Sequence, residues 1–163
     1  MLESSGADGA AFRGLMSRWA TGVSLITCAT DEGPVGCTVN ALTSLSLEPP
    51  RLLVCLDLTA RTLEHLRSAG RFCVNMLAAE QQGLSRQFAS RSSTQAEKFD
   101  GVPFRFDHGT ILLEGCLATL VCDVVEEIVH GDHAIVVGEF VHGEALEGEP
   151  LIFFRSEFGT LVA

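Results

Sequence analysis

The chain has no tyrosine and a single lysine, Lys98, and its acidic side chains far outnumber its basic ones. With 21 Asp and Glu against 11 Lys and Arg, the formal net charge is −10. An acidic surface repels phosphate backbones and anionic lipid headgroups. No apolar run approaches the roughly 18 residues that a membrane-spanning helix needs. We therefore expect a partner other than nucleic acid or a membrane.

Several chemical signatures are also missing. The six cysteines form no CxxC pair and no zinc-ligand spacing, and most lie within apolar runs. The first ten residues, MLESSGADGA, lack the basic start and apolar core of a secretory signal. We therefore expect a cytoplasmic protein with reduced cysteines and no metal. Neither a GxGxxG fingerprint after a strand nor a GxxxxGK[ST] loop occurs, which excludes the usual Rossmann and P-loop modes of nucleotide binding.

What the sequence does contain is a series of short apolar segments separated by turn signals. A length of 163 residues suits one domain. About nine segments read as strands, and they do not alternate regularly with helices. This pattern predicts a mainly β fold, a closed or nearly closed barrel with few helices. The domain is expected over residues 11–163, after a loose tail over residues 1–10.

Three helices are expected among these strands. Residues 11–20 have apolar side chains at helical spacing, with Gly22 ending the helix; these side chains are Phe12, Leu15, Met16 and Trp19. Residues 60–68 carry the apolar pair Leu63 and Leu66, with Thr59 as the expected N-cap and Gly70 at the end. Residues 78–91 form the third helix, and residues 92–104 are polar and expected to be a loop.

Two polar stretches follow core-forming strands. Thr38, Asn40, Thr43 and Ser44 lie between two apolar runs, and such hydroxyls and amides bind an anion or a planar heterocycle without adding charge. Taken alone, the pattern favours a sheet surface whose hydroxyls face solvent, because Thr is a good strand residue and Ser marks turns. After the next strand, free N–H groups of a helix capped by Thr59 would form an anion site beside Arg61 and Thr62. An ordinary helix cap with a solvated arginine is the alternative.

The segment HGDH, residues 130–133, is expected to connect two long strands as a hairpin. Two imidazoles and one carboxylate invite a metal interpretation, but no third ligand type is indicated. A simple turn with surface histidines fits the pattern, as does a neutral His133 that points over a ligand.

The ordered segments WATGVSLIT, GCTVNALTSLSLEPPRLLVCLD, GRFCVNMLAAEQ, KFDGV, GDHAIVVGEF and PLIFFR resemble the short-chain flavin reductases. This resemblance extends from about Phe12 to Leu161. It implies a split β-barrel that binds FMN or FAD, forms a homodimer with flavin sites near the subunit interface, and supplies reduced flavin to a flavin-dependent monooxygenase. NADH or NADPH would be the reductant.

The resemblance also implies which residues form the site. The family's flavin-binding segments correspond here to Thr38, Val39, Asn40, Ala41, Thr43, Ser44, Cys55, Leu56, Asp57, Thr59, Arg61, Thr62, Phe88, Ala89, Ser90, Arg91, Lys98 and Phe99. Its GDH element corresponds to Gly131, Asp132 and His133 and is associated with the nicotinamide. His133 is the candidate catalytic residue, which would position the nicotinamide or tune the charge of the flavin.

One segment departs from the family. Where the family often has Arg, Gly, any residue and Tyr, this chain has Arg155, Ser156, Glu157 and Phe158. Phe158 would stack on a flavin but has no hydroxyl to donate.

Three alternatives to a reductase stay open: a flavin carrier or redox sensor, an oxidase of the pyridoxamine-phosphate type, and a flavin enzyme that acts on a small organic substrate. The sequence leaves open FMN against FAD and NADH against NADPH. It also leaves open whether the flavin stays bound or exchanges.

Overall fold

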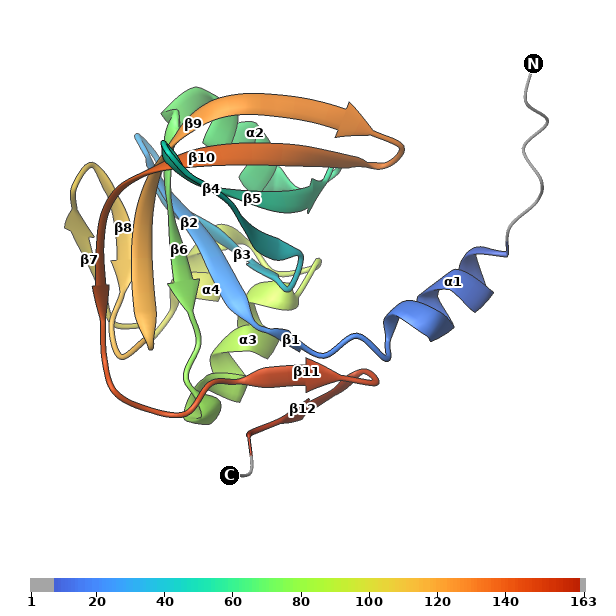
Figure 1. Ribbon diagram of the computed structural model, residues 1–163. Coiled ribbons are helices and arrows are strands. Elements are labelled where there is room, and N and C mark those ends of the chain that lie inside the picture. The colour runs from blue at the N-terminus through green and yellow to red at the C-terminus, as the bar shows by residue number, and fades with distance from the viewer. Residues whose placement is uncertain (1–7, 162–163) are drawn as a thin grey trace, which may run out of the picture.

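A computed structural model describes residues 8–161 as one β-rich body with short helices at its edges (Figure 1). The helices are α1 (Gly9–Met16), α2 (Arg61–Ala69), η1 (Ala79–Gln81), α3 (Gln82–Ala89) and α4 (Gln95–Phe99). The strands are β1 (Thr21–Gly22), β2 (Ser24–Thr30), β3 (Gly33–Val39), β4 (Leu42–Leu47), β5 (Pro50–Asp57), β6 (Arg71–Met76), β7 (Phe104–Asp107), β8 (Thr110–Leu113), β9 (Ala118–His130), β10 (His133–Ala145), β11 (Ile152–Phe154) and β12 (Glu157–Gly159).

The main sheet has seven antiparallel strands in the order β3-β2-β6-β9-β10-β5-β4. The sheet curves until β3 approaches β5, which makes an open barrel. Its interior is filled by apolar side chains that are almost fully buried, among them Ile26, Val54, Phe72 and Val136. The predicted mainly β architecture is therefore confirmed, and so is the hairpin of β9 and β10, in which His130 and His133 are paired.

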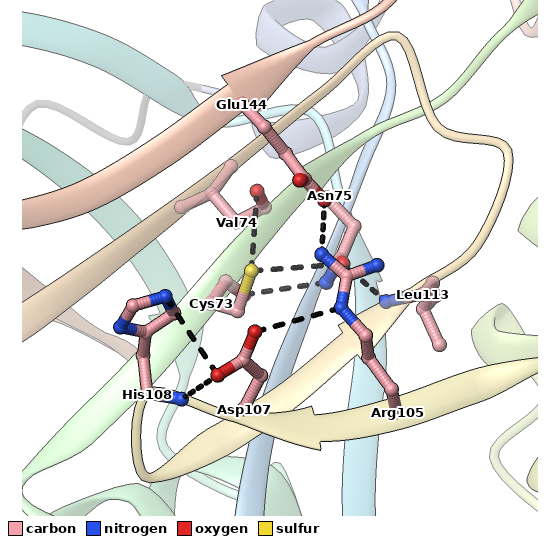
Figure 2. A network of polar contacts seen from close by, with 8 residues as sticks. All are labelled: Cys73, Val74, Asn75, Arg105, Asp107, His108, Leu113 and Glu144. Carbon is pink, nitrogen blue, oxygen red and sulfur yellow. Dashed lines mark hydrogen bonds and ion pairs between the residues drawn. The ribbon is translucent and has the colours of Figure 1, made fainter.

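A short hairpin of β7 and β8 was not predicted; it lies on the side of the barrel opposite α1 (Figure 1). The buried side chain of Asn75 joins it to the sheet, because its Oδ1 accepts from the Leu113 amide at 2.8 Å. Its Nδ2 donates to the Leu25 carbonyl at 3.1 Å. Figure 2 shows the rest of this network, in which Arg105 of β7 pairs with Glu144 of β10. These contacts hold β7 and β8 against the outside of the barrel.

Helix α2 confirms the second predicted helix but starts later. Leu63 and Leu66 are fully buried in the barrel core, which is what fixes the helix on the sheet. The helix ends at Gly70, whose φ of 68° lies in the left-handed region that glycine adopts without strain. The N-cap is Ala60 and not Thr59, because Thr59 donates its N–H and O–H to the Asp57 carboxylate and stays outside the helix.

Helix α1 differs from the prediction at both ends. It begins at Gly9, capped by Asp8, and ends at Met16 rather than near Gly22. None of its residues is buried; it projects away from the barrel (Figure 1), so its apolar face is exposed. Gly9 and Ala10 therefore belong to a helix and not to a loose tail, while residues 1–7 lie outside the described residues.

Helix α4 occupies part of the segment that was expected to be a loop. Thr94 and Glu97 form a reciprocal capping box at its N-terminus. Buried Lys98 and Phe99 then anchor its last turn.

All six cysteines lie in the described part of the chain and are free thiols. Among residues 8–161, no helix has the length and apolar character that crossing a membrane requires.

Candidate functional site

A cleft of about 800 Å³ opens between the ends of β3 and β5, the first turn of α2 and the segment from α3 to α4. This volume is within the range of cofactor sites. Most of the residues expected to bind a flavin line it: Thr38, Val39, Asn40, Ala41, Cys55, Leu56, Asp57, Thr59, Arg61, Thr62, Phe88, Ala89, Ser90, Arg91 and Lys98. Asp132 and His133 line it as well. The fold therefore brings together segments that are far apart in the sequence.

One wall of the cleft is β3, and α3 lies close against it because residue 36 is glycine. A Cβ at Gly36 would meet Phe88 Cε1 at 2.9 Å, so a larger residue would push the helix away. Thr38 donates its hydroxyl to the Ser85 carbonyl of α3 at 2.6 Å. Thr38 thus fixes the wall, and the backbone and Asn40 side chain beyond it stay available to a ligand.

The opposite wall is the turn from β5 into α2. Asp57 Oδ1 accepts from the Thr59 amide at 2.8 Å and from the Thr59 hydroxyl at 2.6 Å. These two bonds lower the pKa of the Asp57 carboxyl, so it is ionised at neutral pH. Ala60 provides no side-chain cap, so the backbone N–H groups of Arg61 and Thr62, which line the cleft at the start of α2, have no side-chain acceptor.

Lys98 provides a buried positive charge at the floor of the cleft. Its side chain is only 6% exposed, and Nζ donates to the Phe88 carbonyl at 2.9 Å. Burial lowers the pKa of the ammonium group, and the ionisable neighbours that act on it are Cys37 and Arg61 rather than a carboxylate. Among residues 8–161 no carboxylate pairs with Lys98, and a buried ammonium of this kind attracts an anion.

The cleft mouth carries an imidazole and two carboxylates. His133 Nδ1 lies 2.7 Å from Asp132 Oδ1, and this hydrogen bond lowers the pKa of Asp132. When the ring is neutral, the bond holds its proton at Nδ1 and leaves Nε2 as an acceptor. His133 also lies directly opposite Asp57 in the β5–β10 ladder.

Five of the expected site residues do not line the cleft. Thr43 and Ser44 are on β4, which leads away from it along the sheet edge, and both are exposed. Phe99 lies behind the cleft wall against Phe88, and Gly131 is at the hairpin turn. Phe158 packs on Phe153 in a second core cluster, with the Arg86 guanidinium 5.5 Å from its ring centroid. In this chain, Phe158 therefore stacks on protein side chains.

The cleft is also lined by four residues that the sequence did not indicate: Arg13, Cys37, Ala60 and Gln95. Gln95 accepts the Gly36 amide at 2.9 Å, and it was missed because its segment was expected to be a loop. Arg13 comes from α1, and nothing in its surrounding sequence links it to a site. In residues 8–161, no group of three or more His, Cys, Asp or Glu side chains could hold a metal ion.

The donors present fit a phosphorylated planar ligand. A buried ammonium and the open N-terminus of α2 suit an anion, while amide and thiol side chains with backbone groups suit a heterocycle. The residues of the cleft therefore fit a flavin nucleotide.

Comparison with known proteins finds relatives over nearly the whole chain. The sequence model of one protein family, the flavin reductase like domain, matches residues 16–162. The reductase component of a 4-nitrophenol 4-monooxygenase/4-nitrocatechol 2-monooxygenase from Rhodococcus opacus is 39% identical over 156 residues, covering 95% of this chain and 82% of that protein. An NADH-dependent flavin reductase from a Rhodococcus species is 35% identical over 152 residues, covering 91% and 84%.

A solved structure agrees with the fold. The NADH:FAD oxidoreductase SgcE6 of Streptomyces globisporus, in complex with NAD and FAD fragments, superposes with a TM-score of 0.89 at 30% identity. The match covers 95% of this chain and 93% of that one. The split-barrel fold expected from the sequence is thus confirmed.

Proposed function

Since the chain belongs to the flavin reductase like domain family, we propose that it is an NADH-dependent flavin reductase acting on FMN or FAD. The observation that carries this proposal is the cleft itself. It contains a buried ammonium that pairs with no carboxylate among residues 8–161. Its rim is polar, and its volume is suitable for a flavin. The names of the similar proteins support NADH as the reductant and leave the choice of flavin open.

The chain's own residues bind the flavin and the nicotinamide and align them with each other. Lys98 and the first turn of α2 hold the flavin phosphate, with Arg61 and Thr62 beside it. The segment from Thr38 to Ala41, which lines the cleft, would hold the edge of the flavin ring. When both ligands are bound, the nicotinamide supplies a hydride that the flavin ring accepts, a step that needs the reacting atoms about 3–3.5 Å apart. His133, with its ring oriented by Asp132, positions the nicotinamide at the mouth.

The reduced flavin would pass to a flavin-dependent monooxygenase, as expected for a chain similar to reductase components of such systems. The chain would act as a homodimer. Support comes from the apolar side chains that stay exposed on α1 and on the edge strand β4, among them Leu15 at 69% and Leu47 at 84%. Their burial against a second copy would place α1, and Arg13 with it, in a fixed position near the cleft.

The test is NADH oxidation by purified apoprotein in air, followed by the loss of NADH absorbance, with FMN, FAD or no flavin and with NADPH in parallel. We expect the rate to rise and saturate with added flavin and NADH to be the better reductant. Tight flavin binding without oxidation would contradict the proposal and indicate a carrier or redox sensor. Oxidation that needs a small organic substrate would indicate a direct-acting flavin enzyme.

Replacement of His133 tests its assigned role. Because His133 lies at the mouth and not beside Lys98, His133→Ala should raise the KM for NADH or slow reduction, by about tenfold. The Kd for flavin should stay nearly unchanged. Steady-state kinetics together with a flavin titration check this, with His65→Ala on α2, a residue that does not line the cleft, as the control. Loss of flavin binding would show that His133 holds the flavin instead.

A further inference from the structure

The loop between α3 and α4, residues 90–94, forms part of the cleft wall, and its two ends are fixed in the core. Phe88 precedes it and Phe99 follows it; both are buried, with ring centroids 4.8 Å apart. Lys98 Nζ also donates to the Phe88 carbonyl, which joins the same two ends. The loop is exposed or half-buried between these anchors, so any movement concentrates at its tip.

Two arginine contacts hold that tip to the opposite wall. Arg61 Nη2 of α2 donates to the Ser93 carbonyl at 2.7 Å. Arg91 Nη2 of the loop lies 3.5 Å from Asp57 Oδ2 at the end of β5. Asp57, Arg61 and Arg91 all line the cleft, so the two contacts join the loop to the side of the cleft that β5 and α2 form.

The ion pair is the weaker of the two contacts. The Arg91 side chain is 88% exposed and that of Asp57 32%. Exposed pairs of this kind are worth little and are screened by salt. Asp57 is nonetheless fixed in place, because Thr59 donates twice to its other oxygen, Oδ1, and leaves Oδ2 for Arg91. The result is a fixed acceptor that faces a largely exposed donor.

We propose that the Asp57–Arg91 ion pair is a gate that sets how fast flavin enters and leaves the cleft. The proposal rests on the proposed function: a reductase that passes its product to another protein must release reduced flavin in every cycle. A weak closure fits that requirement because it opens readily. Arg61 keeps the loop in register while the Arg91 end opens.

A gate and a ligand contact have different kinetic signatures. A gate that closes over the cleft slows association and dissociation together, so its removal raises both rate constants and leaves the Kd nearly unchanged. A side chain that binds the flavin affects mainly dissociation, so its removal raises the Kd. These signatures separate the gate from a direct role of Arg91 on a phosphate.

The experiment is stopped-flow binding and release of FMN with the full chain, comparing wild type, Asp57→Asn, Arg91→Gln and the double variant. The substituted amide at position 57 still has an oxygen for the Thr59 donors but no charge for Arg91. Both rate constants should rise by about two- to fivefold in each variant, with the Kd within about twofold. The double variant should match the single ones, because all three lose the same contact.

Arg86→Gln is the matched control, since Arg86 is on α3 but lies over Phe158 rather than in the cleft. Its rates should equal those of the wild type. Raising NaCl to about 0.5 M should accelerate the wild type toward the variants and change the variants little.

Rates that do not change in Asp57→Asn and Arg91→Gln would overturn the gate. A rise in dissociation alone, confined to Arg91→Gln, would overturn it too and make Arg91 a ligand contact. If the wild type oxidises NADH with added FMN while these rates are unaltered, only the gate fails. If the wild type binds neither FMN nor FAD, the proposed function fails with it.

Discussion

Helices α1 and α2 carry similar apolar patterns, yet only one of them is packed against the barrel. Leu63 and Leu66 of α2 are fully buried, whereas Phe12 and Leu15 of α1 are 65% and 69% exposed. Helix α2 is connected to its neighbouring strands by short turns, while α1 projects away from the body (Figure 1). Periodicity therefore identifies an apolar face but not the surface that covers it. Among residues 8–161 nothing covers the face of α1, and a second copy is the partner that we propose for it.

The largest expected effect comes from truncating the buried face. Leu66→Ala removes a side chain from the closed core and leaves a cavity, so it should lower the free energy of unfolding by about 2–5 kcal/mol. Leu15→Ala on α1 should change it by less than about 0.5 kcal/mol when both are measured by urea unfolding at high dilution. Equal losses at the two positions would mean that α1 packs on its own barrel.

The next effect concerns assembly rather than folding. Phe12→Ser with Leu15→Ser should convert a homodimer to a monomer in sedimentation or light scattering, with the β-rich circular dichroism spectrum retained. Phe106→Ser is the control, because Phe106 is 67% exposed but belongs to β7, which lies on the opposite side of the molecule from α1 (Figure 1). A double variant that stays dimeric would show that another surface, such as the β4 edge, carries the interface alone.

A smaller effect concerns the ion pair that joins α2 to β9. Arg67 Nε donates to Glu127 Oε2 at 2.9 Å, and this bond lowers the pKa of Glu127. A carboxyl with a lowered folded-state pKa contributes stability above its unfolded pKa and loses it as the pH falls through the folded value. Arg67→Gln should therefore melt about 1–3 °C below wild type at neutral pH, and the gap should close toward about pH 3. A gap that is independent of pH would assign the loss to packing.

Much of the fold followed from local pattern. The alternation of apolar runs and turns predicted the strands of the main sheet, and Leu63, Leu66 and Gly70 predicted α2. The β7–β8 hairpin was missed because its turn uses His108 and Gly109, both with positive φ, in place of the more familiar Asn-Gly. Helix α4 did have a signal, the Thr94–Glu97 capping box, but its five residues are too few for a clear apolar period.

The site depended on more than local pattern. The polar stretch after β3 and the turn after β5 were ambiguous as separate sequences, and only the family resemblance joined them. Arg13 and Gln95 line the cleft because of where the fold places α1 and α4, which no local pattern encodes. Thr59 was expected to cap α2, but Asp57 competes for its donors, and that competition depends on the exact path of the turn.

The most direct test of the flavin assignment is the Kd of FMN for Lys98→Met, measured by fluorescence titration beside wild type and Arg86→Met. Methionine keeps the apolar stem of the lysine and removes the buried charge. The account predicts a Kd at least about tenfold higher for Lys98→Met, since a buried charge-assisted contact is lost, and an unchanged Kd for Arg86→Met. Equal affinity of Lys98→Met and wild type would contradict the placement of the flavin phosphate in this cleft.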